Sequence, residues 1–224
     1  MLSSINQYMT SLLITIFVLL VPAMSWADNN PSEPLDVKVI IFTHVSHQAL
    51  NSQTWPNILK KPQQLGHPLN FLSSSKANYQ ILSTNTSVFN NLKRRIKENG
   101  YRVIMMQHWQ QPNHKRGQWI HLFGGHPYDN QGQIQYQLNS DSDYQQAPYW
   151  QIDGYLRINH YRFYQTNAHF YMTTHDNHLG INANSAGITP LKSYELNQKH
   201  ATHLGKWLYF DHPLFGILVK ISKK

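Results

Sequence analysis

At 224 residues and 41% hydrophobic content, the chain can bury the core of one domain or of two closely packed halves. It contains no cysteine, which excludes disulfides, thiolate metal sites, cysteine catalysis and a lipid-modified cysteine. Nineteen Lys and Arg oppose eleven Asp and Glu, so the formal net charge of +8 favours polyanionic partners.

The first 27 residues have the pattern of a cleavable secretory signal. Residues 12–21 are apolar with one exception, Pro22 follows, and Ser25-Trp26-Ala27 places small residues where a signal peptidase reads. The apolar run is half the roughly 20 residues of a membrane-spanning helix, so we expect cleavage and no membrane span afterwards. We therefore expect a mature protein that begins at Asp28 and works outside the cytoplasm, and export argues against nucleic acid as its partner.

Residues 28–35 form a polar, proline-containing tether, and residues 36–43 then predict a β-strand. The continuous apolar stretch 39–42 indicates that this strand is covered on both faces. Residues 44–84 contain three prolines and scattered polar residues. We expect them to be mostly irregular, with a short extended piece at 79–82.

Residues 86–99 predict the one clear helix. Their apolar residues recur at helical spacing on one face, Asn85 or Thr86 can cap the start, and cations crowd the last turns. Gly100 stands where a left-handed residue ends a helix. Residues 101–109 then read as a strand, so the front half is strand, excursion, helix and strand.

After Pro112 the pattern is that of β structure. Candidate strands are residues 119–123, 133–138, 151–163, 167–174, 194–205, 206–209 and 215–221. Turns are expected at Gly124-Gly125, 129–132, Gly180 and 185–187. Asp211-His212-Pro213 should form an Asx-type turn at the corner between two strands, with Gly216 at the exit of that turn. The fold class is α+β, predominantly antiparallel sheet. Residues 36–224 form either a single domain or two packed halves that meet near 112–118.

Patterns of catalysis are mostly missing from the sequence. No Gly-x-Ser-x-Gly frame occurs, and the Ser-x-x-Lys spacing at 73–76 lies in a polar loop. His169, His175 and His178 fall within ten residues but lack a His-Glu-x-x-His frame, so surface histidines are the simpler interpretation. We predict no catalytic residue, cofactor or metal. A cell-wall hydrolase or metal-dependent amidase using these three histidines is the alternative.

Aromatic residues interleaved with amide and guanidinium donors suggest a saccharide or peptide groove. Such residues also favour strand cores, so at least half of the seven aromatics in or beside the β region should simply pack; these are Trp109, Trp119, Trp150, Tyr155, Tyr161, Tyr164 and Tyr171. The candidate ligand-binding residues are Trp109, Trp119, Arg102, Arg116, Tyr155 and Arg157. Trp109 is the first choice because it ends a predicted apolar strand and precedes a polar loop; packing under that loop is the competing interpretation.

The closing segment Tyr209–Ile221 (YFDHPLFGILVKI) resembles the C-terminal signature of the CsiV family, gamma-proteobacterial envelope proteins described as peptidoglycan-binding. In order along the chain, residues 37–42, Gly100–Val103 with His108–Pro112, 119–125 and 154–164 also resemble that family. Residues 198–200 depart from the Arg-rich segment usual there, and 44–84 show little resemblance. The resemblance implies a non-enzymatic wall-binding factor that assists a peptidoglycan synthase, such as a bifunctional penicillin-binding protein or its activator, and it transfers no catalytic residue.

Three functions therefore compete. The leading hypothesis is a periplasmic peptidoglycan-binding accessory protein that supports a cell-wall synthase and cell-shape integrity. The second is the hydrolase or amidase, and the third is a structural module whose cationic face docks another protein.

Overall fold

The computed structural model describes residues 33–43, 58–63, 65–70, 74, 78–135, 147–175 and 190–224. The expected signal peptide, the tether up to residue 32, about half of 44–84 and the expected turns at Gly180 and 185–187 lie outside these residues. So does His178. Signal cleavage and the division into domains therefore stay predictions.

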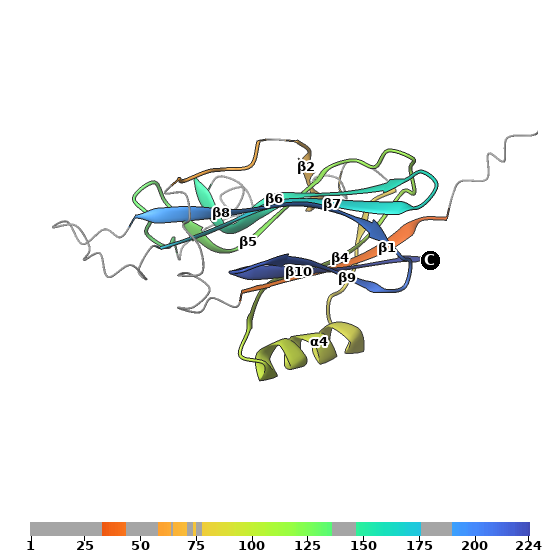
Figure 1. The fold of residues 1–224 in the computed structure, drawn as a ribbon, viewed down its shortest axis with the longest axis horizontal. Helices are drawn as coiled ribbons and strands as arrows, with labels where there is room; N and C mark the ends of the chain where they lie inside the picture. The colour runs from red at the N-terminus through yellow and green to blue at the C-terminus, as the bar shows by residue number, and fades with distance from the viewer. Residues whose placement is uncertain are drawn as a thin grey trace, which may run out of the picture. The chain divides into compact units, whose positions relative to one another are not determined.

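Two β-sheets of five strands each, counted in the described part of the chain, stack face to face (Figure 1). Sheet A has the order β3 (Gln80–Ile81), β4 (Arg102–Gln111), β1 (Leu35–Thr43), β10 (Phe215–Lys223) and β9 (Trp207–His212). Sheet B has the order β2 (His67–Pro68), β5 (Ile120–Tyr128), β6 (Tyr149–His160), β7 (Tyr164–His175) and β8 (Leu191–Thr202). All described pairs are antiparallel except β2 with β5, which confirms the predicted α+β class.

The main core lies between the two sheets. Alternate residues of β1, β4 and β10 meet alternate residues of β5, β6 and β7 there, because successive side chains of a strand point to opposite faces. The largest completely buried side chains of this core include Trp109, Phe170, Phe210 and Phe215.

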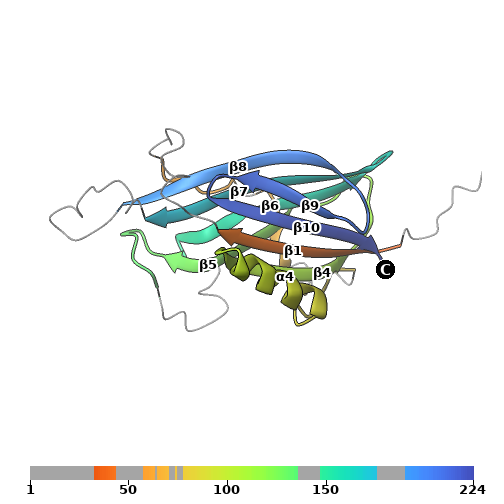
Figure 2. The same cartoon turned by 60° about the horizontal axis from the view of Figure 1, so that its bottom comes forward.

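β1 is covered on both faces, as its apolar stretch predicted. Val39 and Ile41 face the main core, whereas Ile40 and Phe42 belong to a second cluster with Phe89 and Ile96 of helix α4 (Ser87–Glu98). The helix therefore packs on the outer face of sheet A (Figure 2).

The helix ends agree with their sequence signals. At the start, the Thr86 hydroxyl accepts a hydrogen bond from the Phe89 amide at 3.5 Å. At the end, Gly100 has a φ of +81°, and the Tyr101 amide donates to the Ile96 carbonyl at 3.1 Å. This is the hydrogen-bond pattern by which a left-handed glycine closes a helix.

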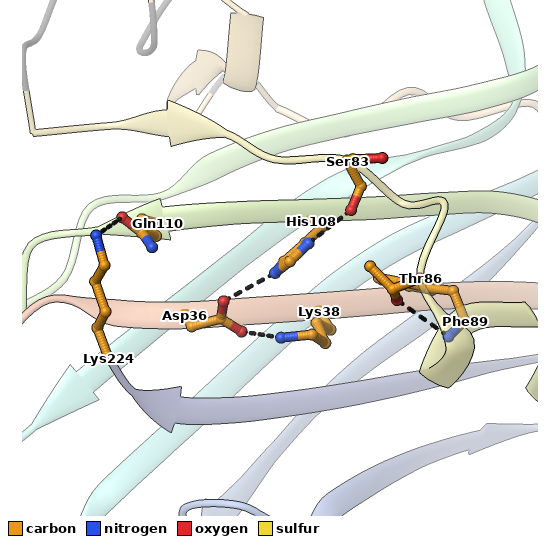
Figure 3. A network of polar contacts seen from close by, with 8 residues as sticks. All are labelled: Asp36, Lys38, Ser83, Thr86, Phe89, His108, Gln110 and Lys224. Atoms are coloured by element: carbon orange, nitrogen blue, oxygen red, sulfur yellow. Dashed lines mark hydrogen bonds and ion pairs between the residues drawn. The ribbon is translucent and has the colours of Figure 1, made fainter.

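A polar network on the outer face of sheet A joins β1, β4 and the segment before the helix (Figure 3). Asp36 contacts the ammonium of Lys38, and its other oxygen lies 2.9 Å from Nε2 of His108. The second ring nitrogen of His108 lies 2.9 Å from the Ser83 carbonyl oxygen. Burial alone would raise the pKa of Asp36, but the hydrogen bonds and charges of Lys38 and His108 outweigh it and lower that pKa.

Two expected turns differ from the observed backbone. Gly124-Gly125 is not a turn between strands but a bulge within β5, where the register against β6 shifts and Gly125 has a φ of +81°. The Asp211-His212-Pro213 segment does form a corner, between β9 and β10. However, Nδ1 of His212, not Asp211, accepts the Leu214 amide there, at 3.2 Å.

Candidate functional site

A groove of about 350 Å³ opens on the outer face of sheet B. Its walls come from residues 65–67, from the connection 112–119 between β4 and β5, and from β6. It contains three of the six predicted binding residues, Trp119, Arg116 and Arg157. We call it the arginine groove.

The connection that carries Arg116 and Trp119 is held against β6 and β7 by three hydrogen bonds. The side-chain Nδ2 of Asn113 donates to the Tyr164 hydroxyl at 2.9 Å, and the backbone amide of Gly117 donates to Oδ1 of Asn159 at 3.1 Å. The His160 amide donates to the Lys115 carbonyl at 3.0 Å. The residues on either side of Arg116 are therefore fixed before any ligand arrives.

Two glycines allow the walls of the arginine groove to meet. A Cβ on Gly117 would lie 1.9 Å from the carbonyl oxygen of Ile158, and one on Gly66 would lie 2.0 Å from the carbonyl oxygen of Trp119. Both contacts are with backbone carbonyl oxygens, which cannot move aside as a flexible side chain can, so only glycine fits at positions 66 and 117. Sequence reasoning missed Gly66 because it stands in the stretch expected to be irregular.

The groove is electropositive and has an aromatic wall. The guanidinium carbon of Arg157 lies 4.4 Å from the centroid of the Trp119 ring, within cation–π distance. Burial, and then the like charge of Arg116, lower the pKa of Arg157. Among the described residues no carboxylate pairs with either arginine.

The Nε atom of Arg157 is buried and has no hydrogen-bond partner in the described structure. An orphaned guanidinium nitrogen is costly in a folded protein, because its hydration has been lost without replacement. An anionic ligand that enters the arginine groove would place acceptors beside the two guanidinium groups. Carboxylates suit such groups, because they accept two parallel N–H bonds from one guanidinium.

Trp109 lies elsewhere, and its assignment as a binding platform needs correction. Its side chain has 0% exposure, and its indole N–H donates to Oε1 of buried Gln111 at 2.8 Å. The predicted strand end was two residues too early: β4 runs to Gln111, so Trp109 is a mid-strand residue paired with Val37 and Ile81. The competing interpretation, packing, fits its position.

Tyr155 and Arg102 also lie outside the arginine groove. Tyr155 is 2% exposed, stacks on His121 with ring centroids 4.7 Å apart, and hydrogen-bonds to the Leu65 backbone. Burial raises the pKa of its phenol. Arg102 is exposed at the start of β4, in the other sheet. Tyr155 thus supports the segment beside the groove, and Arg102 is remote from it.

The two described histidines of the alternative hypothesis, His169 and His175, have ordinary partners. Nε2 of His169 lies 2.9 Å from Oε1 of Glu195, and Nε2 of His175 lies 2.6 Å from the Gly132 carbonyl oxygen. The two stand six residues apart on one strand, which separates them by roughly 20 Å. Within the described ranges, no three His, Asp or Glu side chains gather as a metal site would require.

None of the helical segments in the described part of the chain combines the length and the hydropathy of a bilayer span. Comparison with curated proteins and with solved structures found no match. The family model described as "Peptidoglycan-binding protein, CsiV" matches residues 9–224, essentially the whole chain. The chain therefore belongs to the CsiV family of peptidoglycan-binding proteins.

Proposed function

We propose that this protein binds peptidoglycan through the arginine groove and does not cleave it. Family membership supports peptidoglycan as the ligand. The observation that carries the groove assignment is its unbalanced charge: the guanidinium groups of Arg116 and Arg157 line one cavity beside Trp119, and no described carboxylate pairs with them.

The stem peptides of peptidoglycan carry the carboxylates that such a groove prefers. A carboxylate can bridge the guanidinium groups, and the indole of Trp119 offers apolar surface to the peptide beside it. The net charge of +8 adds long-range attraction to a polymer rich in carboxylates.

In this proposal the protein works in the periplasm as a binding factor for a cell-wall synthase, a bifunctional penicillin-binding protein or its activator, and supports cell-shape integrity. The secretory pattern of residues 1–27 supports the location. The lack of a recognisable catalytic frame in the sequence supports binding rather than hydrolysis.

Co-sedimentation with purified sacculi tests the proposal. The wild-type protein should pellet with sacculi and release no soluble wall fragments, and Arg157→Ala should weaken binding about tenfold or more. Arg94→Ala is the matched control, because this arginine on α4 is 67% exposed and far from the groove in sequence. Release of fragments would instead support a hydrolase, and neither binding nor release would support a module that docks another protein.

A further inference from the structure

Three aromatic side chains form a second surface, on the outer face of sheet A. The rings of Phe42 and Tyr209 are nearly parallel, with an interplanar angle of 8° and centroids 6.2 Å apart. The Tyr101 ring also stacks on Phe42, with centroids 5.7 Å apart and an interplanar angle of 27°. We call these three residues the aromatic shelf. Tyr101 is 42% and Tyr209 43% exposed, so two of the three rings face solvent.

Gly216 explains how rings from strands on either side of β10 meet. It pairs with Phe42 on β1 and with Asp211 on β9. A Cβ at this position would lie 2.7 Å from Cζ of Phe42 and 2.6 Å from Cε2 of Tyr209. The sequence suggested that Gly216 serves the exit of a turn, but it lies within β10 and its role is to let these rings close over the strand.

Asp211 provides a polar edge to the aromatic shelf. The Tyr209 hydroxyl donates to Oδ1 of Asp211 at 2.8 Å, which fixes both side chains. Burial, together with this hydrogen bond and the Asp211 charge, raises the pKa of Tyr209. The phenol therefore stays a hydrogen-bond donor. A carboxylate offers about four acceptor positions, so Asp211 has room for further hydrogen bonds beside that of Tyr209.

A hollow of about 510 Å³ lies over the shelf, lined by the three rings with Asp211 and Leu218. No Lys or Arg is among the described residues that line it. Of the described lining residues only Asp211 carries a charge, and it is negative, so the hollow suits a neutral ligand that offers hydroxyl donors and a flat apolar face. Stem-peptide carboxylates would be repelled from it.

We propose that the aromatic shelf binds a pyranose ring of the glycan strand, an N-acetylhexosamine, whose C–H face lies on Tyr209 and whose hydroxyls donate to Asp211. This inference rests on the proposed function and assigns the two parts of peptidoglycan to two sites. The arginine groove binds the carboxylates of the stem peptide, and the aromatic shelf binds the sugar. The two sites differ in their response to salt, because only the groove depends on charge attraction.

A soluble β-1,4-linked N-acetylglucosamine tetramer tests the shelf alone, because it carries no carboxylate. Titration of the full protein, followed by calorimetry or nuclear magnetic resonance, should show binding that is unchanged between about 0.05 and 0.5 M salt. Tyr209→Ala should weaken that binding about tenfold or more, and Arg157→Ala should leave it unchanged. Tyr161→Ala is the matched control, because this tyrosine is 57% exposed in the β6–β7 hairpin of sheet B.

Asp211→Asn provides a second variant that keeps the shape of the side chain and an acceptor for Tyr209, and it should weaken tetramer binding several-fold. If the protein pellets with sacculi but the tetramer does not bind, or binds equally to both shelf variants, the shelf inference is wrong and the proposed function stands. If the protein binds neither sacculi nor the tetramer, the proposed function itself fails.

Discussion

Truncation of Trp109 separates the two interpretations of this tryptophan. Its side chain is 0% exposed and belongs to the core between the sheets, so Trp109→Ala should lower the free energy of unfolding by about 3–5 kcal/mol. For a domain of this size, that loss corresponds to a fall in Tm of roughly 6–20 °C. Wall binding measured well below the Tm should not change, because the residue touches no surface.

Comparison with Trp109→Phe separates the contributions of packing and of hydrogen bonding to the loss in free energy of unfolding. Phenylalanine keeps most of the volume but removes the indole N–H, which leaves Oε1 of the 1%-exposed Gln111 without this donor at a cost of about 1–3 kcal/mol. Thermal unfolding followed by circular dichroism measures both variants, and Trp119→Ala in the arginine groove is the control for a half-buried tryptophan. A Tm that barely moves in Trp109→Ala, with a clear loss of binding to sacculi, would refute the assignment to the core.

Three further predictions concern stability, charge and processing. Asp36→Asn should destabilise the fold by about 1–3 kcal/mol near neutral pH, because it weakens the contacts of Asp36 with Lys38 and His108. The folded-state pKa of Asp36 is lowered from 3.8, so its stabilisation is present above that value and is lost as pH falls through the folded pKa; urea titrations that show the same difference at pH 7 and pH 2.5 would contradict this. Binding to sacculi should weaken between about 0.05 and 0.5 M salt in co-sedimentation, and unchanged binding would mean that charge is not the main attraction. Intact mass of protein from the periplasm should correspond to a chain that begins at Asp28, whereas a mass that retains residues 1–27 would refute cleavage.

The local elements were predictable because their signals are local. Helix α4 follows from apolar spacing, the Thr86 cap and Gly100, and the structure confirms each of these. The order of strands was not predictable, since Leu35 pairs with Lys223 at the far end of the chain. No local pattern encodes a pairing across that separation.

The errors have physical causes as well. A Gly-Gly pair supplies the same backbone freedom to a turn and to a bulge, so Gly124-Gly125 could not be assigned from sequence. Trp109 and Trp119 both stand near the connection between the sheets. The sequence predicted that the strand ends at residue 109, but β4 continues to Gln111, so Trp109 lies in the core. Trp119 lies beyond the end of β4, in the arginine groove.

Only part of the arginine groove could be predicted from the sequence. Arg116 and Trp119 are close in the chain, but Arg157 joins them only because β6 lies beside β5 and presents its odd-numbered residues outward. The aromatic shelf was missed although Tyr209, together with Asp211 at its polar edge and Gly216 beneath it, stands in the segment that carries the family resemblance. The approach of Tyr209 and Gly216 to Phe42 requires the pairing of β10 with β1, which the sequence does not reveal.

The two proposed surfaces use the outward positions of different sheets, and this separation governs how they act together. Packed sheets lie about 10 Å apart, and the side chains of each outer face extend further in opposite directions. The arginine groove and the aromatic shelf thus share no side chain or hydrogen bond, so their contributions to the free energy of binding should add. A polymer that repeats sugar and stem peptide can occupy both surfaces through different repeats, and occupation of one raises the effective concentration of the polymer at the other. Modest affinity at each surface is then enough to hold the protein on the wall.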